Sequence, residues 1–330
     1  MRTHTKSQNY VLYVCGKKKK MKKIVFYVLL VIILAYAWRE LTYIGIRKNE
    51  IGEYDKLNTI FLKKNNFSTL VIGSSRAETH IVPSIIDSIT GQNTFNMGME
   101  GEFMPLVFGI LKAYLVHSDA PKNIIINIDY HPYTGKVVVN RFPRFYSYLG
   151  NDALYKSLCK AEPRYLWFKW NPFYSMSFFN DQYLYASVRG YAGIKSRFDK
   201  SFDKGYVAGT PEFQQIFDTI HYVPFHSLPE KDIFENFDSI INICKKKKIN
   251  LIPVVTPMYC KGTAAVINKK ELINEFAEMI KRNNLSFLDY STDSMCYDTA
   301  WFSDPYHLNK KGSEFFSWKF AKDLQQYLVK

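Results

Sequence analysis

Apolar residues along the chain follow two alternating patterns, short continuous runs and longer segments in which they recur every three or four positions. The short runs predict buried strands at residues 68–72, 94–97, 123–128, 251–255 and 285–288. The helical spacing between them predicts helices, most clearly over residues 81–89, 104–115, 233–248, 268–280 and 316–328. This alternation predicts a doubly wound parallel sheet in a three-layer α/β/α fold, with its ligand site at the carboxyl ends of the strands.

Residues 132–230 interrupt this pattern inside the domain that spans residues 68–330. The stretch is dense in Tyr, Phe and Trp and lacks regular strand alternation. We interpret it as a mostly helical insertion at the edge of the ligand site. Its aromatic side chains either stack on sugars or, as is more common, form the insertion's own core.

The longest apolar run, Ile24 to Trp38, contains no charged residue. At about 1.5 Å per residue it falls short of a bilayer core of roughly 30 Å. Extension to residue 46 gives a transmembrane signal-anchor over 24–46, whereas Ala-Tyr-Ala at 35–37 leaves a cleaved signal peptide as the alternative. In the anchor interpretation residues 47–67 form a short polar stalk or a helix.

The formal net charge of +14 is concentrated at this end of the chain. Residues 1–23 carry eight positive charges and no acid, which leaves +6 for the remainder. Such a distribution predicts a basic cytoplasmic tail and an extracytoplasmic domain at the cell membrane, and it argues against a nucleic-acid partner. The five cysteines show no metal-binding spacing, so we expect no metal. Disulfides are possible for the four cysteines of the exported part, and buried free thiols are the expected state for most of them. His80 has no partner at a metal-ligand spacing and is expected to be structural.

Three polar motifs lie at predicted strand ends or in the last loop. Residues 73–76 (GSSR) put a serine on a sharp turn between strand and helix, where its hydroxyl is exposed. Residues 96–101 (NMGMEG) carry glycines that leave an amide free to face an oxyanion. Asp304 precedes His307 by three positions, so its carboxylate can orient the imidazole. Each motif alone is weak, because Gly-Ser-Ser is common in loops and Asp-x-x-His often begins a capped helix.

In their order and placement these motifs resemble those of the SGNH/GDSL hydrolase superfamily, over residues 68–131 and 231–328. The resemblance implies that Ser75 is the nucleophile and that His307 and Asp304 complete a catalytic triad. Ser74 occupies the place of the usual aspartate. The residues DPYHLN at the end of the chain are the most specific part of the match.

The same resemblance implies an oxyanion hole made by the amides of Ser75 and Gly101. The family's third block also supplies an Asn after the third strand, but here that place reads Asp129-Tyr130-His131. We hypothesise that His131 or Tyr130 replaces the Asn as a donor; the alternative is that His131 packs at the mouth of the insertion. Arg76 is a candidate for binding an anionic substrate, with pairing to a nearby acid as the alternative.

The missing Asn and the single N-terminal anchor are similar to membrane-anchored members of the superfamily, such as the teichoic-acid D-alanine transfer protein and the alginate acetylation proteins. The resemblance implies a serine-dependent O-acyltransferase or esterase that acts on a cell-surface glycan or polymer. An acyl donor and a multi-spanning membrane O-acyltransferase are the expected partners, and no cofactor is implied. The alternative is a non-catalytic module on the same fold that binds polymer or organises an acyl-transfer complex.

Overall fold

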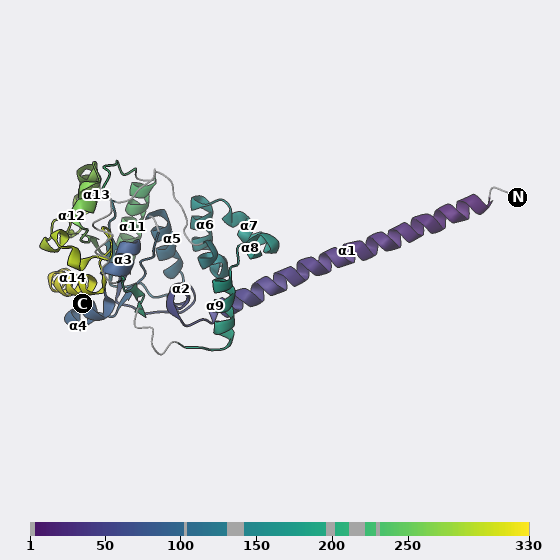
Figure 1. The fold of residues 1–330 in the computed structure, drawn as a ribbon, viewed down its shortest axis with the longest axis horizontal. Coiled ribbons are helices and arrows are strands. Elements are labelled where there is room, and N and C mark those ends of the chain that lie inside the picture. Colours follow the sequence, from purple (N-terminus) through teal and green to yellow (C-terminus); the bar gives the residue numbers. More distant parts are fainter. Residues whose placement is uncertain are drawn as a thin grey trace.

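The computed structural model describes residues 4–101, 104–130, 142–195, 202–210, 222–228 and 232–329 (Figure 1). In this part of the chain a five-stranded parallel sheet has the order β2 (Thr94–Asn96), β1 (Thr69–Ile72), β3 (Asn123–Asn127), β6 (Asn250–Val255), β7 (Leu288–Asp289). This is a doubly wound order, with its switch point between β1 and β3. The expected α/β fold is confirmed, although β7 begins three residues later than expected.

Successive side chains of each strand enter different cores, because they point to opposite faces of the sheet. In β3, Ile124 and Ile126 join one core and Ile125 joins the other. The first core includes residues of α2 (Gly52–Phe61), α5 (Met104–Tyr114), α11 (Ile233–Lys247) and α13 (Lys269–Arg282). The second includes residues of α3 (Ser75–His80), α4 (Pro83–Thr90) and α14 (Lys310–Leu324). Burial on both faces explains why the strands are continuous apolar runs.

Of the two expectations for residues 47–67, a stalk or a helix, the structure shows a helix, and this helix is packed in the domain and does not form a free stalk. Within this segment, α2 places Leu57, Ile60 and Phe61 in the first core. Lys56 is buried as well, with its ammonium 2.9 Å from Glu78 of α3. The polar residues between the apolar positions suggested an exposed linker, but they lie on a helix whose inner face packs on the sheet layer.

Helix α1 (His4–Arg47) projects far beyond the rest of the molecule (Figure 1). Its segment Lys20–Arg47 is long and apolar enough to cross a membrane. The last turns of α1 are docked, since Tyr43 and Ile46 are buried in the first core. The expected transmembrane segment therefore continues directly into the domain.

The insertion is mostly helical in its described part, as expected. It contains a 3-10 helix, η1 (Phe142–Tyr148), then α6 (Asp152–Ala161), α7 (Tyr165–Trp170), α8 (Pro172–Met176) and α9 (Asp181–Tyr191). A short hairpin, β4 (Phe202–Asp203) and β5 (Tyr206–Val207), follows. Helix α9 packs along the base of α1, and α6 packs on α5. The cysteines at positions 159, 244, 260 and 296 are unpaired, as expected.

Truncation of a core side chain of α2 tests whether this helix is part of the folded domain. Ile60→Ala should lower the free energy of unfolding by about 2–5 kcal/mol, because it leaves a cavity in the core. The measurement is urea unfolding of the full chain in detergent. Lys64→Ala, at a side chain that is 75% exposed, should change the same quantity by less than about 0.5 kcal/mol. Equal small effects of both changes would contradict the packing of α2.

Candidate active site

The turn between β1 and α3 sets the position of Ser75. Gly73 has φ +145°, and a Cβ there would lie 2.9 Å from the Cβ of Ala77 and 3.1 Å from that of Asn127. Only glycine fits this backbone conformation and this close approach. The hydroxyl of Ser74 accepts a hydrogen bond from the Arg76 amide and caps α3. Ser75 is therefore the first residue of a helix that starts at the carboxyl end of the sheet.

Ser75, His307 and Asp304 form a continuous hydrogen-bonded set. The Ser75 Oγ is 2.8 Å from His307 Nε2, and His307 Nδ1 is 2.9 Å from Asp304 Oδ2. In this arrangement Nδ1 donates to the carboxylate, so Nε2 is left to accept the hydroxyl proton. The structure thus brings together the three residues that were predicted from the sequence motifs to form a triad.

A single local turn holds Asp304 against His307. The Asp304 Oδ1 accepts hydrogen bonds from the amides of Tyr306 at 2.8 Å and His307 at 3.0 Å. Burial by itself would raise the pKa of Asp304, but the hydrogen bonds and charge of His307, together with these amides, bring that pKa below its ordinary value. The carboxylate is therefore ionised at neutral pH, as required to orient an imidazole.

His80 supports the loop that carries His307. Its Nε2 accepts a hydrogen bond from the Leu308 amide at 3.0 Å, so the proton of this neutral ring is on Nδ1. The His80 ring stands edge-on to His307, with 6.3 Å between centroids. Burial, followed by the charges of Arg76 and His307, holds the pKa of His80 well below 6.5. The expectation that His80 is structural fits these contacts.

A cavity of about 310 Å³ opens beside Ser75, His307 and Asp304. Residues 207–210, at the end of β5 and just after it, form one wall, as expected for an insertion at the edge of the site. Glu78 and Glu100 also line the cavity. The charge of Glu78 is balanced by the buried ammonium of Lys56, 2.9 Å away.

Arg76 has an internal partner, which corrects its expected role in substrate binding. Its side chain is 3% exposed, and Nη1 lies 3.1 Å from Asp129 Oδ1. It also donates to the carbonyl of Thr256, at the end of β6. Arg76 does not line the cavity, and its charge is satisfied inside the protein. The alternative of a buried pair with a nearby acid is the correct one.

In the glycine-containing loop after β2, most of the described backbone amides have hydrogen-bond partners. The Gly98 amide donates to the Asn96 side chain, the Met99 amide to the Gly73 carbonyl and the Glu100 amide to Glu78. Gly101 has φ +73°, and its amide has no hydrogen-bond partner within the described residues. Its assignment as an oxyanion donor stays a prediction, as does that of the Ser75 amide.

The side chains of Asn127 and Tyr130, at the end of β3 and after it, have partners inside the protein. Asn127 donates to Asp129 and accepts from the Thr256 amide, so both ends of its side chain are occupied. Tyr130 is buried, with its hydroxyl 3.4 Å from Thr263, and it does not line the cavity. This contact gives no support to the hypothesis that Tyr130 replaces the Asn, and the hypothesis stays a prediction. His131 lies outside the described residues.

Lys56 of α2 stabilises the cavity wall, and sequence reasoning missed it. Its ammonium donates to Glu78 and to the carbonyls of Gly98 and Gly205. It therefore connects α3, the glycine-containing loop and the β4–β5 turn. No local signal predicts such a role for a lysine in a segment that resembled a stalk. Among the described residues, no group of three His, Cys, Asp or Glu side chains is placed to hold a metal ion.

No protein-family model and no curated protein matches the chain. Among solved structures, a protein assigned to the G-D-S-L lipolytic family of Desulfitobacterium hafniense DCB-2 is 10% identical, with a TM-score of 0.41 and coverage of 78% of this chain and 99% of its own. A gut microbial diltiazem-metabolizing enzyme is 12% identical, with a TM-score of 0.40; the match covers 81% of this chain but only 48% of that one.

A further structure, from a Bacteroides fragilis NCTC 9343 protein assigned as an acylhydrolase, is also 12% identical, with a TM-score of 0.38 and coverage of 82% of this chain and 94% of its own. Likeness at this level does not define an activity. The functional proposal below therefore depends on the geometry of the site itself.

The neutral state of buried His80 predicts a pH dependence of stability. Below pH 6.5 the unfolded chain binds a proton at this position and the folded chain does not, so stability should fall as the pH falls. Between pH 7 and 5 the full chain should lose about 2 kcal/mol more than His80→Gln. Urea unfolding at several pH values measures this difference. His226→Gln, at an exposed histidine, is the control and should show the same pH dependence of stability as the unaltered chain. If stability falls equally with pH in the unaltered chain, His80→Gln and His226→Gln, the assignment of His80 as a buried neutral ring is refuted.

Proposed function

We propose that the chain is a serine-dependent esterase or O-acyltransferase of the SGNH/GDSL type. The observation that carries this proposal is the hydrogen-bonded set Ser75–His307–Asp304 at the edge of a cavity. A serine, an imidazole and a carboxylate in this order activate an otherwise weak nucleophile. The position of Ser75 at the carboxyl end of a parallel strand, next to the switch point of the sheet, agrees with a ligand site.

The proposed reaction has two acyl-transfer steps. The Ser75 Oγ attacks the carbonyl carbon of an ester while His307 Nε2 takes its proton. The ester bond then breaks, and the leaving alcohol takes that proton from His307, which leaves an acyl-serine. In the second step His307 takes a proton from water or from an acceptor hydroxyl, whose oxygen attacks the acyl carbon. The bond between that carbon and Ser75 Oγ then breaks, and Oγ takes the proton back from His307. Asp304 stabilises the imidazolium in both steps.

The oxyanion of each tetrahedral intermediate would be held by the amides of Ser75 and Gly101. Loss of one donor typically costs about 10²–10³ in rate, so a site without the family's Asn needs another donor or reacts slowly. His131 and Tyr130 stay the side-chain candidates.

We further propose that the enzyme acts outside the cytoplasmic membrane on a cell-surface glycan or polymer, with a multi-spanning O-acyltransferase as a partner. Support comes from the apolar helix and the basic residues that precede it. Residues 35–37, where a signal peptidase would cut, are helical, and Ala35 is buried. This favours an uncleaved anchor. The rival proposal, a non-catalytic module on the same fold, does not require the aligned triad.

Labelling with a fluorophosphonate probe separates the two proposals. Ser75→Ala and His307→Ala should each abolish labelling, because one removes the nucleophile and the other its base. Asp304→Asn should slow labelling without abolishing it. Two of these substitutions combined should lower the labelling rate little more than one of them does alone, because the three residues act as a unit. Ser74→Ala is the control and should keep the label on Ser75. A label on Ser74 would place the nucleophile elsewhere, and no label on the unaltered chain would favour the non-catalytic module.

A fusion experiment tests the orientation in the membrane. A reporter that is active only outside the cytoplasm, fused after Lys330, should be active, because the lysines before α1's apolar segment retain the N-terminus inside. Replacing the lysines at positions 17–20, 22 and 23 by glutamine should lower this activity. A reporter that works only in the cytoplasm, active at the same fusion point, would refute the export of the domain.

A further inference from the structure

Two short helices beside the base of α1 expose large apolar side chains. Helices α7 and α8 carry a set of four, which we call the apolar shoulder: Leu166, Trp167, Trp170 and Phe173. Both helices lie on the side of the domain from which α1 projects (Figure 1). The described residues that line the cavity beside Ser75 include none of the four, so the proposed reaction does not account for their exposure.

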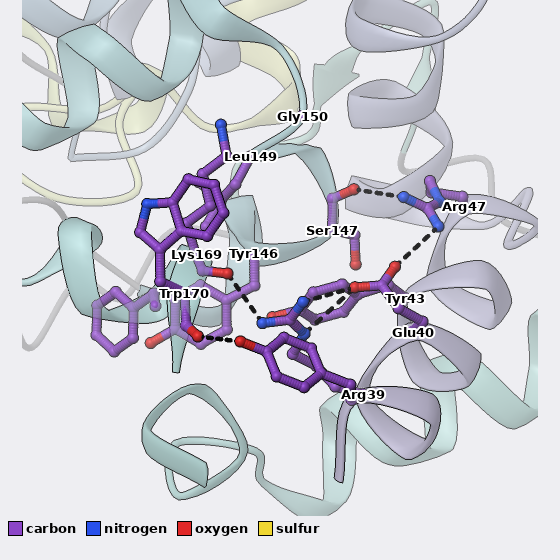
Figure 2. A pocket seen from close by; sticks show the side chains of 12 residues that line it. Arg39, Glu40, Tyr43, Arg47, Tyr146, Ser147, Leu149, Gly150, Lys169 and Trp170 are labelled. Carbon is purple, nitrogen blue, oxygen red and sulfur yellow. Dashed lines mark hydrogen bonds and ion pairs between the residues drawn. The ribbon is translucent and has the colours of Figure 1, made fainter. Parts of the chain in front are cut away.

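The apolar shoulder is held against the last apolar turns of α1. The Tyr36 hydroxyl donates to the Trp170 carbonyl. Arg39 donates to the Lys169 carbonyl at 3.0 Å (Figure 2). Helix α8 packs on α1 as well. The carboxyl end of α7 therefore stands beside residues 36–39 of α1, at a position along the helix that the fold sets.

The length of α1 gives the depth at which the shoulder would meet a bilayer. The uncharged run Ile24 to Trp38 spans about 22 Å, about 8 Å less than a hydrocarbon core of roughly 30 Å. About five more residues, 39–43, are needed to complete the span. These residues are already docked, since Arg39 bonds to α7 and Tyr43 is buried in the first core. A bilayer that covers them must also cover what lies beside them.

The shoulder then lies at a depth that is usual for side chains that dip into one leaflet. Residues 36–39 are about 6–10 Å inside the end of the span at residue 43. Amphipathic helices that lie in a membrane surface bury their apolar face about 5–10 Å below the headgroups. The two depths agree.

The charged side chains at this level have partners inside the protein. Arg39 is buried and bonds to Glu40 at 2.8 Å, in addition to the Lys169 carbonyl (Figure 2). The ammonium of Lys169 lies 3.8 Å from the carboxylate of Asp152. Charged residues at membrane depth normally face protein and pair with one another or with backbone carbonyls. The pairing of Arg39 therefore fits a position below the headgroups.

The composition of the surface around α1 also fits lipid. Trp167 is 62% exposed and Trp170 is 66% exposed. Tyr191 of α9 is exposed too, and its hydroxyl donates to the Leu41 carbonyl of α1 at 2.7 Å. Clustered exposed apolar side chains mark an interaction surface, and Trp and Tyr are the residues enriched where a protein meets the membrane interface.

We propose that the apolar shoulder inserts into the membrane leaflet on the domain's side and contacts phospholipid acyl chains just below the headgroups. With α1 as one attachment and the shoulder as a second, the domain is held in one orientation on the bilayer. The inference rests on the proposed membrane anchorage of α1 and does not depend on the chemistry at Ser75.

Quenching of tryptophan emission by brominated phospholipids tests the insertion. The full chain is reconstituted in phosphatidylcholine vesicles whose lipids carry bromine on acyl carbons near the headgroup. Trp167→Phe and Trp170→Phe should each remove emission that the brominated lipid quenches, because bromine quenches only at close range. Trp318→Phe is the control, at an exposed tryptophan of α14, the helix at the end of the domain away from α1 (Figure 1). It should remove emission that the lipid leaves unquenched.

Extraction of the same vesicles with alkaline carbonate reports the anchorage of α1 separately. If the chain resists extraction but the emission of Trp167 and Trp170 is not quenched, the shoulder proposal is overturned and the anchor stands. Unquenched emission that is also shielded from aqueous iodide would assign the shoulder to a contact between copies of the chain, and would overturn it too. A chain that carbonate removes would overturn both the anchor and the shoulder. Fluorophosphonate labelling of these vesicles shows a failure of the esterase proposal independently.

Discussion

The buried ion pair between Arg76 and Asp129 is the interaction on which the candidate active site depends. It joins the first turn after β1 to the end of β3, across the switch point of the sheet. Arg76 also bonds to the carbonyl of Thr256 after β6, and Asp129 accepts the hydroxyl of Ser74 at 2.5 Å. Removal of one member of a buried pair typically costs about 3–5 kcal/mol, because the other charge is left unpaired. The orientation of Ser75 is thus fixed by a polar cluster that lies behind the cavity.

The triad combines one local and one long-range arrangement. Asp304 and His307 are neighbours on a single turn, and the hydrogen bonds of that turn orient the imidazole whether or not the serine is near. Ser75 is 232 positions away in the chain. It reaches His307 because α3 and α14 pack on the same face of the sheet and because His80 holds the Leu308 amide. A histidine outside the triad therefore sets the separation between nucleophile and base.

The sequence predicted features that depend on local patterns. Apolar runs located the strands, and the rule that parallel strands end at one edge brought Ser75 and His307 into one site. Features that depend on distant contacts were not predictable in this way. Lys56 bonds to the carbonyl of Gly205, which is 149 positions away, so its burial is invisible in the surrounding residues. The same is true of the contact between the Tyr130 hydroxyl and Thr263, which is 133 positions away.

The insertion joins the apolar helix α1 to the cavity beside Ser75. Helices α1 and α9 approach so closely that a Cβ on Gly190 would lie 1.8 Å from the carbonyl oxygen of Gly45, and Ser187 donates to the Thr42 carbonyl at 2.9 Å. Small residues of this kind allow two helix backbones to meet. Further along the insertion, residues 207–210 line the cavity beside Ser75. The base of α1 is therefore a packed element of the domain, and the insertion that packs on it also lines the cavity beside Ser75, so the position of α1 relative to Ser75 is set by the fold.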